Sequence, residues 1–158
     1  MSLETVRAFL GAHAPNVPII DQGRSTATVL EAAETLGVEP GQIAKTLSVR
    51  AGEQVLLIVA RGDARLDNRK FKHAFGVRPR MLGHEETEAL TGHPVGGVCP
   101  FGLATPLAIY CDQSLRDFAI VYPAAGSRTA SVEIAPERLA ELVGAYWTDV
   151  CRPPEPAV

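Results

Sequence analysis

The spacing of hydrophobic residues in the first part of the chain predicts two short helices. Between residues 3 and 12, hydrophobic residues three and four positions apart would share one face of a helix that ends near Gly11. In the segment 28–37, a threonine and a glutamate have the spacing of a capping box, and helical spacing continues to a glycine. We therefore expect an amphipathic helix in each segment.

Longer hydrophobic runs predict the strands at the centre of the fold. Residues 54–60 are almost uniformly hydrophobic, as in a strand covered on both faces, and residues 42–49 would pair with them through a turn at 51–53. Shorter patterns predict strands at 78–82, 107–111, 118–122 and 131–134, and helices at 67–75, 85–90 and 136–144. This arrangement is typical of a single α/β domain with a mixed central β-sheet flanked by helices.

The composition limits the classes of protein to consider. A length of 158 residues fits one domain, which we place at 1–150, followed by a frayed, proline-rich tail at 151–158. The first 15 residues lack the continuous hydrophobic segment of a signal peptide, and no run of about 18 hydrophobic residues occurs, so we expect a cytoplasmic protein without a membrane partner. The three cysteines and four histidines are scattered, which predicts reduced thiols, no metal site and no cofactor.

The formal net charge of −3 hides a basic segment at 61–80, which holds seven basic and two acidic residues. A local excess of positive charge can attract phosphate groups even on an acidic protein. The same segment could also be an ordinary solvated helix face, and the charge pattern alone leaves both interpretations open.

Two features near the middle of the chain could carry chemistry. Lys45 interrupts a segment that otherwise looks buried, so its ammonium either extends to solvent or faces a pocket that receives negative charge. The segment 92–102, GHPVGGVCPFG, has six glycines or prolines, and free amides near Gly96 and Gly97 could hold an oxyanion or a phosphate. The alternative is a rigid turn with prolines at its ends.

Two further features have simpler alternatives. Cys99 suggests a nucleophile with His93 as its base, but nothing in the sequence brings the two side chains together. A third glycine turn, at 123–128, follows a predicted strand and could be only a hairpin turn.

Four segments occur together in a characteristic order and spacing: Gly37-Val38 followed by IAKTL at 43–47, RLDNRK at 65–70, TGHPVGGVCPFG at 91–102 and AAGS at 124–127. With these segments the chain resembles the YbaK/ProX family, free-standing relatives of the editing domain inserted in bacterial prolyl-tRNA synthetases. The resemblance runs from about residue 26 to residue 142. It implies an α/β domain that hydrolyses the ester between a wrong amino acid and the 3′ adenosine of a tRNA, without a metal or a covalent protein nucleophile.

The resemblance also implies roles for particular residues. The family's functional lysine falls on Lys45, and the glycine whose amide faces the reacting carbonyl falls on Gly96, with Gly97 as a second candidate donor. The candidate substrate-binding residues are Thr26, Thr28, Thr46, Gly126 and Ser127. The residues expected to hold tRNA phosphates are Arg65, Arg69, Lys70 and Lys72.

Two positions limit what can be transferred from the family. Ala124 stands where some relatives have a serine, so no role of that hydroxyl applies here. Cys99 stands where relatives also carry serine, which favours a packing role.

The sequence thus predicts a trans-editing aminoacyl-tRNA deacylase for a small mischarged amino acid. Its partners would be the acceptor end of the mischarged tRNA and an aminoacyl-tRNA synthetase. The alternatives are a non-catalytic tRNA-binding module and a cysteine-dependent esterase.

Overall fold

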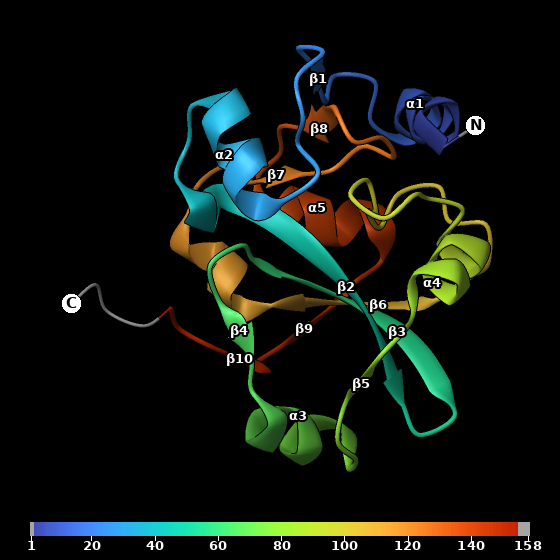
Figure 1. Cartoon of the computed structure of the whole chain (residues 1–158), viewed down its shortest axis with the longest axis vertical. Helices are drawn as coiled ribbons and strands as arrows, with labels where there is room; N and C mark the ends of the chain where they lie inside the picture. The colour runs from blue at the N-terminus through green and yellow to red at the C-terminus, as the bar shows by residue number, and fades with distance from the viewer. Residues whose placement is uncertain (1, 155–158) are drawn as a thin grey trace.

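The long hairpin predicted from the sequence forms the centre of the fold (Figure 1). In the computed structural model, which describes residues 2–154, β2 (Ile43–Ala51) pairs antiparallel with β3 (Gln54–Arg61) over almost its whole length. β3 pairs in parallel with β6 (Ala108–Asp112), and β6 pairs in parallel with β9 (Tyr146–Thr148). The central sheet is therefore mixed, as predicted.

The other edge of β2 is paired only near its two ends. β7 (Tyr122–Pro123) pairs in parallel with residues 43–44, and β5 (Arg80–Met81) pairs antiparallel with residues 49–50. Among the described residues, no strand pairs with residues 45–47 on this edge. This gap in the sheet positions the candidate site.

The described residues contain five α-helices, all close to their predicted positions. Their bounds are Ser2–His13 (α1), Val29–Leu36 (α2), Asn68–Phe75 (α3), His84–Thr91 (α4) and Pro136–Val143 (α5), with short 3₁₀ helices at Pro40–Gln42 (η1) and Gln113–Asp117 (η2). The predicted caps of α2 are present: the Thr28 hydroxyl accepts from the Glu31 amide at 3.1 Å, and Gly37 ends the helix with φ +70°. Within residues 2–154, no helix has the length and apolar character needed to cross a membrane.

Both faces of the hairpin are covered, which explains the uniform hydrophobicity of residues 54–60. Leu57 and Val59 pack with residues of α1 and α5, whereas Leu56 and Ile58 pack on the opposite face with Phe71 of α3. Figure 1 shows α1 and α3 on opposite sides of the hairpin. All four β3 side chains are 0% exposed, and burying each stabilises the fold by about 1.5–3 kcal/mol.

The predicted strand at 118–122 is wrong except at its end, where β7 begins. The preceding residues form η2, and the Phe118 amide still donates back into that helix, so the chain is turning where a strand was expected. The Phe118 ring packs under the Arg61 guanidinium, 5.0 Å from its carbon to the ring centroid. The hydrophobic residues at the start of the predicted strand are therefore explained by side chains that pack in a turn.

The predicted tail at 151–158 begins too early. Cys151 and Arg152 form β10, which pairs antiparallel with β4 (Arg65–Leu66). The Asp112 carboxylate fixes this strand by accepting from the Val150 and Cys151 amides at 2.8 and 3.1 Å. Residues 155–158 of the predicted tail lie outside the described residues.

One further strand pair was only half predicted. β8 (Ala130–Val132) overlaps the expected strand at 131–134, but its partner β1 (Ile19–Asp21) was not predicted. β1 is three residues long, which is too short for a clear alternation of hydrophobic and polar residues.

Candidate active site

A cavity of about 410 Å³ opens at the gap in the edge of β2, between β5 and β7. The Leu82 amide donates to the Ser48 carbonyl at 3.1 Å, so the backbone of Ser48 points to this edge. Alternate residues of a strand direct their backbone groups to the same edge, and therefore the N–H and C=O of Thr46 face the gap. Within residues 2–154 no strand pairs with Thr46 on this edge, so the β2 wall of the cavity offers its backbone N–H as a donor and its C=O as an acceptor.

Five of the predicted site residues line this cavity: Lys45, Gly96, Thr26, Thr28 and Thr46. They come from β2, from the cap of α2 and the loop before it, and from the glycine-rich segment, so the fold brings together residues that are 70 positions apart in sequence. The three remaining candidates for catalysis or substrate binding lie outside the lining.

The glycine-rich segment forms a tight turn whose backbone faces the cavity. The Gly97 amide donates to the Pro94 carbonyl at 2.8 Å, and Gly96 has φ +94°, as at the third position of a type II turn. The Arg128 Nε atom donates to the Val95 carbonyl at 2.8 Å and holds the turn in place. The Gly96 amide has no hydrogen-bond acceptor within residues 2–154, so it is free to bind a ligand.

Gly97, Gly126 and Ser127 support this turn from behind. A Cβ atom on Gly97 would lie 2.7 Å from the Ser127 amide nitrogen, and the Gly126 amide donates to the Gly97 carbonyl at 3.0 Å. The Ser127 hydroxyl accepts from the Ala130 amide at 3.1 Å and so stays in its own turn. The geometry gives these three residues a supporting position and no direct access to the cavity.

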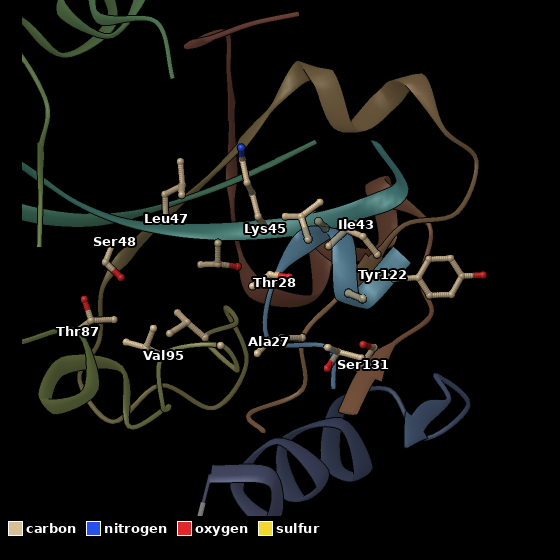
Figure 2. A pocket seen from close by; sticks show the side chains of 18 of the residues that line it. Ala27, Thr28, Ile43, Lys45, Leu47, Ser48, Thr87, Val95, Tyr122 and Ser131 are labelled. Carbon is tan, nitrogen blue, oxygen red and sulfur yellow. The ribbon is translucent and has the colours of Figure 1, made fainter. Parts of the chain in front are cut away.

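The ammonium of Lys45 points away from the Gly96 turn. In Figure 2, the side chains of Lys45 and Leu47 extend from one side of β2, whereas Ala27, Val95 and Ser131 lie on the other. The Lys45 Nζ atom donates to the Ala64 carbonyl. Burial lowers the pKa of this ammonium below its usual value. Lys45 and Gly96 therefore line the same cavity, but the amine and the amide do not converge on one point.

Several residues of the cavity were missed by the sequence analysis. Ser48 follows Thr46 by two positions and projects from the same face of β2, while Thr87 and His84 come from α4. The alternation along β2 could have indicated Ser48. Nothing in the sequence places α4 beside β2, because that contact is made across 36 residues or more.

The predicted tRNA-binding residues lie outside the cavity, on β4 and α3. Arg65, Arg69 and Lys72 are exposed, whereas Lys70 donates to the Asp149 carboxylate at 3.0 Å and to the Cys151 carbonyl at 2.9 Å. The hydrogen bond to Asp149 raises the pKa of Lys70. Ala64, which accepts from Lys45, directly precedes this basic surface, so Lys45 lies between the surface and the cavity.

Cys99 has no path to a substrate. Its side chain is 0% exposed and is absent from the cavity lining. Burial raises the pKa of its thiol to about 12, so the nucleophilic thiolate is scarce at neutral pH. The His93 Nε2 atom lies 3.5 Å from the sulfur but 2.7 Å from the Phe101 carbonyl, its better partner. Cys99 and His93 therefore form part of the core.

The part of the chain that the structure describes holds no group of three or more histidine, cysteine, aspartate or glutamate side chains that could bind a metal ion. The titratable side chains at the cavity are those of Lys45, His84 and Tyr122. The Tyr122 hydroxyl donates to the Glu133 carboxylate at 2.9 Å, and in Figure 2 it points away from the cavity. Backbone amides and neutral hydroxyls thus dominate the lining.

Comparison with known proteins identifies similar chains. A family model described as "Aminoacyl-tRNA editing domain" matches residues 24–142. "Uncharacterized protein YwhH" of Bacillus subtilis (strain 168) is 46% identical over 154 residues, which cover 96% of this chain and 98% of that protein. "Putative Cys-tRNA(Pro)/Cys-tRNA(Cys) deacylase EbsC" of Enterococcus faecalis is 32% identical over 75% of this chain and 73% of its own length. A crystal structure described as "a putative trans-editing enzyme for prolyl tRNA synthetase" matches with a TM-score of 0.88 and 33% identity, over 96% of this chain and 98% of that one.

Proposed function

Because the chain belongs to the aminoacyl-tRNA editing domain family, we propose that it is a trans-editing deacylase that releases a small, wrongly attached amino acid from the 3′ adenosine of a tRNA. The observation that carries this proposal is the free Gly96 amide, held at φ +94° in the wall of a cavity beside the unpaired edge of β2. Such an amide is a ready donor for an oxygen that gains negative charge during ester hydrolysis.

The chemistry begins with attack of water on the ester carbonyl carbon. A new carbon–oxygen bond forms, the carbonyl oxygen becomes an oxyanion, and the amides of Gly96 and Thr46 are the donors available to stabilise it. The attacking water gives one proton to the neighbouring ribose 2′ hydroxyl, or to a second water held at the Thr46 carbonyl, and that group passes a proton to the ribose 3′ oxygen. The ester bond then breaks as the carbonyl reforms, so that the tRNA leaves with a free 3′ hydroxyl and the amino acid leaves with a free carboxyl group.

Lys45 serves the RNA side of the substrate. Its ammonium lies on the face of β2 that leads to the basic residues of β4 and α3, and its stem lines the cavity. A cation at this point suits the phosphate that precedes the terminal adenosine. The acceptor stem would then run across Arg65, Arg69 and Lys72 toward the cavity. An aminoacyl-tRNA synthetase that makes the mischarged tRNA is the proposed source of the substrate.

The cavity suits a small amino acid. Its volume of about 410 Å³ has to hold the terminal adenosine as well as the aminoacyl group, and Val95, Ala27 and Ala44 line it together with the hydroxyl-bearing residues of β2. Exclusion by size alone discriminates by about 1–3 kcal/mol for each methylene group.

A panel of mischarged tRNAs tests this function directly. The protein is incubated in excess with tRNAs that carry different amino acids, and release of the free amino acid is followed in single turnover. Hydrolysis of tRNAs that carry small amino acids, and its loss in Gly96→Ala, would support the proposal. Tight binding of tRNA without release of any amino acid would overturn it and indicate a non-catalytic tRNA-binding module.

A further inference from the structure

Three buried hydroxyl groups without hydrogen-bond partners surround the cavity. Within residues 2–154, the only buried side-chain nitrogen or oxygen atoms that lack a partner are Thr26 Oγ1, Thr46 Oγ1 and Ser48 Oγ. All three residues line this one cavity. Thr26 and Ser48 are 6% and 7% exposed, so these groups cannot be satisfied simply by bulk water.

The buried hydroxyl of Thr91, which lies outside the cavity lining, is paired. Thr91, which is 1% exposed, donates to the Thr87 carbonyl at 2.7 Å and accepts from the His93 amide at 3.1 Å. A buried hydroxyl without a partner lowers stability, because its hydration is lost and no hydrogen bond replaces it. Three such groups around a single cavity indicate that their partner arrives with the ligand.

The positions of the three hydroxyls divide the cavity into two parts. Thr46 and Ser48 alternate along β2 and share one face, about 7 Å apart along the strand. Figure 2 shows the Ser48 and Thr87 side chains pointing toward one another at one end of the cavity, with Val95 beside them. Thr26 belongs to the opposite wall, next to Ala27 in the sequence. Ala27 is close to the Gly96 turn, because a Cβ added to Gly96 would lie 3.1 Å from the Ala27 Cβ.

This division matches the two polar ends of a small aminoacyl group. Its α-amino group is attached beside the reacting carbonyl, so the Thr26 hydroxyl, near the Gly96 turn, suits the amino group. Its side chain would extend along β2 toward Ser48. Neither aspartate nor glutamate lines the cavity in the described part of the chain, which gives a basic side chain no counter-charge.

We propose that Ser48 and Thr46 are specificity-determining residues that select an aminoacyl group with a hydroxyl on its side chain, an inference that rests on the proposed deacylase function. A hydroxyl in the ligand can both donate and accept, so it pairs with either residue after a rotation about χ1. A thiol is a weaker donor and acceptor, and a methyl group leaves both hydroxyls unpaired. The expected order of substrates is serine or threonine, then cysteine, then alanine.

The test compares one tRNA charged with serine, cysteine or alanine. Wild-type protein is expected to release serine at least about tenfold faster than alanine, because a site that pairs a substrate hydroxyl rejects an analogue without one. Ser48→Ala and Thr46→Val should each lower the ratio of the serine rate to the alanine rate toward one. Both variants should unfold at the wild-type temperature or above it, because each removes an unpaired buried hydroxyl.

Thr91→Val is the matched control, since it also removes a buried threonine hydroxyl, but one that is paired and outside the lining. It should lower the unfolding temperature and keep the ratio of serine to alanine rates. Equal rates for serine and alanine in the wild type, or an unchanged ratio in both β2 variants, would overturn the inference and leave the deacylase proposal intact.

A binding experiment separates the two proposals if no tRNA is hydrolysed. Adenosine analogues that carry seryl or alanyl groups in a stable 3′ amide are titrated into the wild type and Ser48→Ala. Tighter binding of the seryl analogue to the wild type alone would support the selectivity, even though the deacylase function had failed. Equal binding of the two analogues by the wild type would overturn the selectivity as well.

Discussion

Replacing Gly96 with alanine separates the backbone geometry of the turn from its chemistry. Gly96 has φ +94°, and an added Cβ would lie 3.1 Å from the Ala27 Cβ and 3.2 Å from the Arg128 Cγ. Gly92 offers a matched control, because it has φ +77° and its added Cβ would also lie 3.1 Å from an alanine Cβ, that of Ala104. Gly92 ends α4 and is absent from the cavity lining.

The expected magnitudes follow from these contacts. A left-handed backbone conformation costs an L-residue about 1–2 kcal/mol, so both variants should lose a similar amount of free energy of unfolding. Only Gly96→Ala also alters a residue whose backbone lines the cavity. Displacing one oxyanion donor raises the barrier by about 3 kcal/mol, which lowers the single-turnover rate by about 10²- to 10³-fold.

The assay combines denaturant unfolding with single-turnover deacylation on the best tRNA of the panel. Gly96→Ala and Gly92→Ala should lose a similar amount of free energy of unfolding, but only Gly96→Ala should have a lower single-turnover rate of deacylation. If the two variants lost the rate to the same extent, the effect would come from strain or unfolding, and the Gly96 amide would have no part in catalysis.

Three further results are expected. Lys45→Met should lower deacylation at least about tenfold, yet leave the free energy of unfolding unchanged or higher near neutral pH. Burial lowers the pKa of Lys45, so the cost of burying its charged form is fully present below the folded-state pKa and fades as the pH rises from there toward the ordinary lysine pKa of the unfolded chain. A clear loss of stability near pH 7 would contradict this. Charge reversal at Arg69 and Lys72 should weaken tRNA binding and make it less dependent on salt concentration, whereas charge reversal at the exposed Arg138 on α5 should have neither effect. Equal effects of the two changes would show that α3 does not bind the tRNA. Cys99→Ser should keep most of the deacylase activity, because this thiol is buried and has a pKa of about 12. Complete inactivation of a folded Cys99→Ser variant would support the alternative of a cysteine-dependent esterase.

The elements with strong local signals could be predicted from the sequence. The hairpin of β2 and β3 followed from the uniform hydrophobic run at 54–60, and α2 followed from its capping threonine and final glycine. These signals depend on residues a few positions apart, and tertiary contacts reinforce them. The short strands β1, β4, β9 and β10 have two or three residues each and carry no such signal.

The candidate site could be predicted only as a set of positions. The motif order indicated Lys45 and Gly96, and the three threonines were predicted as candidate pocket residues; all five line the cavity. The direction of the Lys45 amine depends on which face of β2 its position occupies and on the distant Ala64 carbonyl, so the sequence could not supply it. Ser48 was missed because the sequence gives no sign that the hydroxyl of this serine is buried without a hydrogen-bond partner, which only the three-dimensional structure shows.

Because residues 45–47 of β2 lack a strand partner on one edge, the backbone and the side chains of this short segment are available for different roles. The backbone of Thr46 is common to any residue at that position, whereas the side chains of Thr46 and Ser48 can be exchanged without altering the ladder to β3. Under the proposed function, point substitutions on this strand would change which amino acid is removed, while the backbone groups proposed to act on the ester would stay the same. Variation among related chains should accordingly concentrate at alternate positions of β2.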